Sequence, residues 1–241
     1  MFKYIAVFAA LSVSFMPQLT PAKGTPSAKQ HLVMAIDVAL EPDATMIQHA
    51  KAANADLLRV FPKGFPLDAT HQPHITLVQR YVLASALPKV YSALDKVFAT
   101  SRAASWKLEA FKYYYIPAGS IGVAGIVVRS TADLVKLQHE VIDAVAPFTV
   151  KTGNAAAFYT TPSEPEIQSP LIEYVSTFVP NASGKNFNPH VTTGIGPTEY
   201  LNKLLSQPFI PFTFSPVGAS IYQLGDFGTA RKKLKLFALA Q

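Results

Sequence analysis

The spacing of apolar residues along this chain switches between a period of two and a period near 3.6, which predicts both strands and helices. After Asp43, a favourable helix N-cap, apolar side chains recur from Met46 to Leu58 on one helical face. Short runs rich in β-branched and aromatic residues predict strands. Helices are expected over 46–58, 86–99, 134–145, 169–178 and 199–205, and strands over 32–38, 74–82, 106–116, 121–129, 189–195, 209–214, 219–224 and 234–239.

The order of these elements predicts an α+β fold. Helices are interleaved with pairs of strands, and the segment 117–119 (Pro-Ala-Gly) joins two strands in the manner of a hairpin. No glycine-rich phosphate loop follows a strand, as it would in a doubly wound parallel sheet. A chain of 241 residues is also long enough to bury a substantial core.

The N-terminal segment carries a targeting pattern. Lys3 precedes an apolar run over 4–16, and small residues surround a plausible cleavage site after Ala22. The run is short for a membrane span, so residues 1–22 are predicted to be a signal peptide and residues 23–30 a linker. The expected location is the periplasm or the extracellular medium, with no stable membrane span once the signal is removed. An uncleaved anchor at the membrane surface is the alternative.

Composition excludes several kinds of chemistry. The chain has no cysteine, which rules out disulfides, thiolate metal ligands and cysteine nucleophiles. Its formal net charge is +6, and loss of Lys3 with the signal leaves +5, since 6 − 1 = 5. A basic balance suits an anionic substrate or surface.

One tetrapeptide pattern occurs twice, as Pro-His-Ile-Thr at 73–76 and as Pro-His-Val-Thr at 189–192. In a strand, residues i and i+2 project from the same face, so each copy presents one imidazole and one hydroxyl to a common surface. Two accidental copies with the same proline and apolar residue are expected in fewer than about one chain in a thousand. The pair therefore predicts a shared functional site.

These residue types suit phosphodiester cleavage. Water must be activated by a base and the leaving oxygen protonated by an acid, and histidine serves either role near neutral pH. His74 and His190 are the candidate catalytic pair, with neither assigned as acid or base, and Thr76 and Thr192 are candidate donors to the phosphate oxygens. Metal ligation that also uses His71 is the competing interpretation. No carboxylate shares a tight ligand spacing with these histidines, so no metal or other cofactor is expected.

The paired motifs resemble the two-histidine phosphoesterase superfamily, which includes RNA 2′,3′-cyclic phosphodiesterases and 2′-5′ RNA ligase-like proteins. Residues 65–82 (FPLDATHQPHITLVQRYV) and 222–234 (YQLGDFGTARKKL) are similar to its exported bacterial branch. One position departs from the family pattern, because an aliphatic residue, Leu77, follows the first motif but Thr193 follows the second.

The resemblance implies a fold and a reaction. Residues 31–241 are expected to form a single domain of two similar lobes, each an antiparallel sheet with flanking helices. Both His-x-Thr strands are expected to lie in the cleft between the lobes. The implied reaction is hydrolysis of a cyclic phosphate or phosphodiester, with RNA or a nucleotide as the substrate and no cofactor.

Other residues are weaker candidates for this site. Arg80 lies on the same alternating strand face as His74 and is expected at the phosphate rim, and Tyr159 is expected in a lid over the cleft. One of the three tyrosines at 113–115 can offer its ring to a nucleobase, and the basic run 231–235 can attract a polyanion. Each candidate also has a purely structural interpretation. Arg80 can be a solvated strand end and Tyr159 part of an ordinary surface loop, while the tyrosines can pack in the sheet and the basic run can simply be solvated.

Three alternative functions are compatible with the sequence. The first is a non-catalytic module of the same fold that binds RNA or a nucleotide. The second is an RNA 2′-5′ ligase that runs the reverse reaction, which export disfavours because RNA fragments with matching ends are scarce outside the cytoplasm. The third is cleavage of lipid- or sugar-linked phosphodiesters in the cell envelope.

Overall fold

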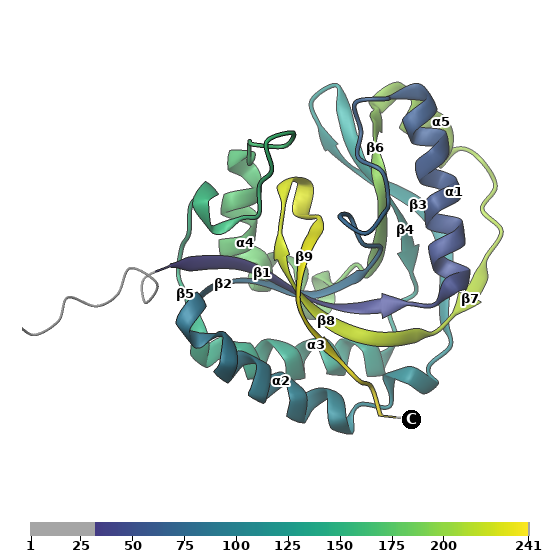
Figure 1. Ribbon diagram of the computed structural model, residues 1–241. Coiled ribbons are helices and arrows are strands. Elements are labelled where there is room, and N and C mark those ends of the chain that lie inside the picture. Colours follow the sequence, from purple (N-terminus) through teal and green to yellow (C-terminus); the bar gives the residue numbers. More distant parts are fainter. Residues whose placement is uncertain (1–31, 241) are drawn as a thin grey trace, which may run out of the picture.

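The computed structural model describes residues 32–240, whose strands form one curved antiparallel sheet (Figure 1). The predicted signal peptide and linker lie outside these residues. Every strand pairing in the sheet is antiparallel and helices flank it, which confirms the α+β class. The strands are β1 (Val33–Pro42), β2 (Ile75–Leu83), β3 (Leu108–Ala118), β4 (Ile121–Val128), β5 (Thr149–Val150), β6 (His190–Pro197), β7 (Phe212–Phe214), β8 (Pro216–Leu224) and β9 (Ala230–Phe237).

The sheet consists of two halves that have the same plan. Its strand order is β7-β3-β4-β6-β2-β1-β8-β9, with the short β5 paired to β2. The motif strands β2 and β6 are the innermost strands of their halves. In the described chain the two halves join where Ile75 of β2 pairs with Val191 of β6. The fold therefore places the two motifs next to each other at the seam between the halves.

The helices flank the two halves and link them. α1 and α5 pack against the half that contains β6, whereas α3 and α4 pack against β2, and α2 packs on α3. Figure 1 shows α1 and α5 on one side of the molecule and α2, α3 and α4 on the other side and below. Because α1 follows β1 in the chain but packs on β6, it connects the halves. The helices are α1 (Ala44–Val60), α2 (Leu87–Thr100), α3 (Ala132–Val145), α4 (Ser169–Ala182) and α5 (Thr198–Leu205).

Helix α1 begins where the sequence predicts. The Asp43 carboxylate accepts from two backbone N–H groups of the first turn at 3.0 and 3.3 Å, which satisfies donors that have no partner within the helix. Further along α1, the buried Asn54 side chain donates to the Phe65 carbonyl at 2.9 Å and accepts from the Leu67 N–H at 3.0 Å. The helix thus fixes the loop that leads into the first motif.

The two faces of β1 differ in character. Ile36, Val38 and Leu40 are fully buried in the main hydrophobic core, on one face of the sheet. The alternate residues, among them the buried Asp37, point to the other face, where the functional site is found. No helix within residues 32–240 combines the length and the apolar character that a membrane crossing requires.

Candidate active site

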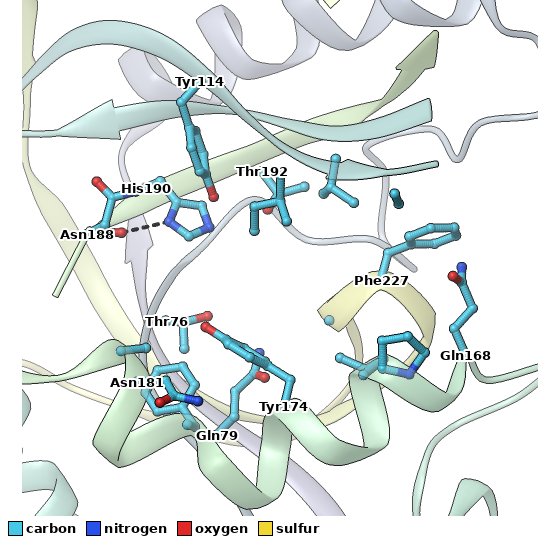
Figure 2. Close-up of a pocket in the computed structure, with 18 of the residues that line it drawn as sticks. Thr76, Gln79, Tyr114, Gln168, Tyr174, Asn181, Asn188, His190, Thr192 and Phe227 are labelled. Atoms are coloured by element: carbon cyan, nitrogen blue, oxygen red, sulfur yellow. Dashed lines mark hydrogen bonds between the residues drawn. The ribbon is translucent and has the colours of Figure 1, made fainter. Parts of the chain in front are cut away.

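One pocket lies between the two halves of the sheet, with a volume of about 530 Å³. His74, Thr76, His190 and Thr192 all line it, so the structure brings the four motif side chains together. Figure 2 shows His190 and Thr192 on one side of the pocket and Thr76 with Gln79 on the other. Helix α4 and the loop at 226–228 form further walls.

Each motif strand contains a β-bulge directly after its threonine. In β2, Thr76 pairs with Ala39 and Val78 with Val38, so Leu77 is the extra residue. In β6, the pairing likewise skips Thr193. A bulge shifts the alternation of side chains by one position. Thr193, the position that departs from the family pattern, is thus a buried bulge residue that lies outside the pocket lining.

Both imidazoles are oriented by the backbone carbonyl two residues earlier. His74 Nδ1 lies 2.7 Å from the Gln72 carbonyl oxygen, and His190 Nδ1 lies 2.7 Å from the Asn188 carbonyl oxygen. Because a carbonyl only accepts, each Nδ1 carries the proton, and in the neutral ring Nε2 is the free basic nitrogen. The intervening prolines have a fixed φ and restrict the preceding residue to extended conformations, which holds these carbonyls in place.

His74 lies beside a buried acid. Its Nε2 atom is 3.5 Å from Oδ2 of Asp37, and both side chains are almost inaccessible to solvent. Burial acts to lower the pKa of His74, but the hydrogen bond and charge of Asp37 outweigh it, so the pKa is raised above its ordinary value. The sequence pattern does not single out Asp37. The available signal was a single acidic residue within the apolar run 32–38.

His190 has the opposite electrostatic environment. Its ring lies against Tyr114, with 4.7 Å between the ring centroids. Burial lowers the pKa of His190 to about 4, the Asn188 carbonyl acts against this, and the nearby charge of His74 lowers it further. The pocket therefore contains one imidazole whose pKa is raised, which favours its charged form, and one whose pKa is lowered, which favours its neutral form.

The two threonines also differ. The Thr76 hydroxyl donates to Asp37 Oδ2 at 2.7 Å, so its proton is engaged. The Thr192 hydroxyl makes no side-chain hydrogen bond within the described part of the chain, and it lines the pocket. Thr192 is thus the motif hydroxyl that is free to donate to a ligand.

Comparison with known proteins establishes the fold. No family model and no curated protein matches the sequence. The structure of TT0787 from Thermus thermophilus matches with a TM-score of 0.51 and 16% identity, covering 86% of this chain and 98% of that chain. The chain therefore shares the α+β fold of TT0787.

Two other solved structures match less closely by TM-score. E. coli LigT complexed with ATP gives a TM-score of 0.44 at 13% identity, covering 87% of this chain and 99% of that chain. Kluyveromyces marxianus Usb1 gives 0.43 at 9% identity, covering 88% and 99%.

The walls of the pocket are largely aromatic and apolar. Of the three consecutive tyrosines, Tyr114 lines the pocket, and Tyr174 of α4 and Phe227 line it from other sides. Phe227 has a positive φ of 54°, a conformation that is strained for this residue type and is held here by the surrounding loop. Among residues 32–240, no lysine or arginine lines the pocket.

Arg80 and Tyr159 do not line the pocket. The bulge at Leu77 reverses the alternation beyond it, so Gln79 faces the pocket and Arg80 points to the opposite side of β2. Tyr159 instead lies near the basic run, with its ring centre 6.0 Å from the Arg231 guanidinium carbon and 5.9 Å from Lys232 Nζ. Strict alternation from the motif could not reveal the placement of Arg80.

The basic run at 231–235 lies within β9 and is largely engaged by acids. Arg231 is buried, where its guanidinium contacts Glu164 and the His71 ring. His71 also stacks on Phe65, with 4.8 Å between centroids, so it belongs to a separate cluster from the motif histidines. In the described part of the chain, no three His, Cys, Asp or Glu side chains form a group that could hold a metal ion.

Proposed function

We propose that this protein is an exported phosphodiesterase that hydrolyses a cyclic phosphate, with the 2′,3′-cyclic phosphate of a nucleotide or RNA end as the best candidate. The observation that carries the proposal is the pair of His-x-Thr motifs in one pocket, with the two imidazoles biased towards opposite protonation states. General acid-base cleavage requires that combination.

The proposed reaction uses His190 as the base and His74 as the acid. Neutral His190 removes a proton from water through Nε2 as the water attacks phosphorus, and protonated His74 gives its proton to the departing ribose oxygen. The P–O bond to that oxygen breaks, and a phosphomonoester forms. The Thr192 hydroxyl donates to a non-bridging oxygen. A bound phosphate anion raises the pKa of His190 towards that of a working base. Proton exchange with solvent then restores both rings.

The pocket is suited to a small substrate with a single negative charge. Its volume of about 530 Å³ lies within the usual range for small-ligand sites. Aromatic walls can stack on a base, and the lining in residues 32–240 offers no cation beyond the histidines to bind several phosphates. These features favour a cyclic mononucleotide or a short RNA end over a long polyanion.

The decisive experiment is a hydrolysis screen of the mature protein against 2′,3′-cyclic nucleotides, 2′-5′ dinucleotides and generic phosphodiesters, with and without EDTA. His74→Ala and His190→Ala should each lower the rate by about 10²–10⁴, the usual contribution of a positioned acid or base. His139→Ala, which changes an exposed histidine on α3, is the matched control and should retain full activity. The rate should follow a bell-shaped pH profile and survive EDTA.

The same screen separates the alternatives. Nucleotide binding without turnover would indicate a binding module. Formation rather than cleavage of 2′-5′ linkages would indicate a ligase, and activity confined to generic or lipid-linked diesters would indicate an envelope substrate. Loss of activity with EDTA, followed by recovery with a divalent ion, would contradict the acid-base mechanism.

A further inference from the structure

Asp37 is a fully buried carboxylate behind the pocket, which it does not line. Its Oδ2 atom accepts from the Thr76 hydroxyl at 2.7 Å and from the Gln79 amide at 3.0 Å, and lies 3.5 Å from His74 Nε2. Its Oδ1 atom has no hydrogen-bond partner in the described chain. A buried carboxylate is costly unless a positive group compensates it, and protonated His74 is the adjacent group that can do so.

The other half of the sheet has no equivalent acid. The pairings around the two bulges correspond, because Ala39 faces Thr76 as Gly125 faces Thr192. Two residues before the first of these is Asp37, and two residues before the second is Val123. Asp37 is thus an acidic residue that one half has at this position and the other half lacks.

Several ionisable groups surround His74. They are Asp37 and Glu41 of β1, His190 of β6 and Tyr222 of β8. Tyr174 of α4 lies near Asp37, and Lys233 of β9 pairs with Glu41. The charge of Glu41 is already engaged by Lys233, and its carboxylate accepts from the Tyr222 hydroxyl at 2.6 Å. Asp37 has no such counter-ion other than His74 within the described residues.

We propose that Asp37 is a positioning residue that makes the two motifs unequal, by keeping His74 in its charged form as the proton donor and by holding the hydroxyl of Thr76. This inference rests on the proposed function for its catalytic consequence. The direction of proton transfer through the pocket is then fixed by one carboxylate, with His190 left as the base.

The test is Asp37→Asn, which can retain an oxygen acceptor for Thr76 and Gln79 and removes the negative charge. NMR titration of the His74 and His190 rings measures their proton affinities without any substrate. We expect His74 to titrate at lower pH in the variant. The basic limb of the pH profile of kcat/KM should also move to lower pH. At pH values above that limb, kcat/KM of the variant should be about 10–100-fold lower than that of the wild type. Glu41→Gln removes a carboxylate from the same strand and is expected to shift His74 less.

A second variant keeps the inference testable if Asp37→Asn does not fold. Val123→Asp places a carboxylate at the equivalent position of the other half, where the side chain is partly accessible to water. It should raise the pH at which His190 titrates. Unchanged His74 titration in Asp37→Asn, or unchanged His190 titration in Val123→Asp, would overturn the inference. If no substrate is hydrolysed but His74 titrates lower in Asp37→Asn, the proposed function fails while the role of Asp37 stands.

Discussion

At the scale of single residues, the proline of each motif helps to fix the orientation of the histidine that follows it. Pro73 and Pro189 each lie between a motif histidine and the residue whose carbonyl fixes its tautomer. The distance from Nδ1 to that carbonyl oxygen is 2.7 Å in both motifs. A ring whose Nδ1 proton is held by the backbone has only one orientation in which Nε2 faces a ligand. The Pro-His dipeptide therefore orients the imidazole through local backbone geometry, and it can be recognised in the sequence alone.

The half-buried His190, whose neutral form is favoured, predicts a pH-dependent loss of stability. Its pKa is about 4 in the folded chain, against 6.5 for an unperturbed histidine, so between these values the unfolded chain binds a proton that the folded chain does not. Acidification through this window should lower the free energy of unfolding, with about 3 kcal/mol as the upper limit. The loss should be smaller than this limit, because the ring is partly accessible to solvent.

The measurement is chemical denaturation at several pH values between 4 and 7. His190→Gln should lack this component of the pH dependence, whereas His139→Gln on the exposed face of α3 should keep it. The same slope in wild type and His190→Gln would contradict the prediction.

At the scale of elements, the contact between α1 and β6 fixes both motifs at once. Gly194, after the bulge in β6, has a φ of 139°, and an added Cβ would lie 2.8 Å from the Asn54 Nδ2 atom and 3.2 Å from Leu57 Cδ1. Asn54 also holds the loop that leads to His74, through Phe65 and Leu67. One glycine thus allows α1 to approach the second motif strand while it supports the first.

We predict that Gly194→Ala destabilises the fold by roughly 3–5 kcal/mol, from backbone strain and overpacking together. It should also reduce activity, because Asn54 must move. Gly119→Ala is the matched control, since its φ is 68° and an added Cβ would meet nothing within 4 Å. That variant should cost only about 1 kcal/mol. Denaturant unfolding measures both, and equal losses would refute the role of the α1 contact.

At the scale of the whole molecule, the net charge and the charge in the pocket differ. The chain has a formal net charge of +6, yet no lysine or arginine of residues 32–240 lines the pocket. Binding that depends on several phosphate contacts loses affinity steeply with salt. We therefore predict that kcat/KM for a cyclic mononucleotide changes by less than about twofold between roughly 50 and 200 mM salt. A steep decrease would reveal a cation that contacts the substrate.

Export is also a property of the whole chain, and it stays a proposal. The basic start, the apolar run at 4–16 and the small residues near Ala22 motivate it. N-terminal sequencing of the protein from the cell envelope should give a mature chain that begins near Lys23. An intact Met1 on protein from the cytoplasm would be the opposite result.

The sequence by itself predicted most of the helices and strands and the four motif side chains, but it missed β5 and placed the start of β9 four residues late. Helix α1 begins after Asp43 as predicted, because N-capping depends on residues within one turn. The His-x-Thr pairs face one surface because a strand alternates every two residues. Both are local rules, and they needed no knowledge of the neighbouring strands.

Only the tertiary structure decided which partners surround those side chains. Asp37 and the Thr76 whose hydroxyl it accepts from are 39 positions apart in the sequence. The bulge at Leu77, which turns Gln79 rather than Arg80 towards the pocket, arises only when β2 pairs with β1. The opposite pKa shifts of His74 and His190 follow from these partners and from burial. Burial and strand register arise from contacts between distant segments, and hydrophobic periodicity along the chain does not specify them.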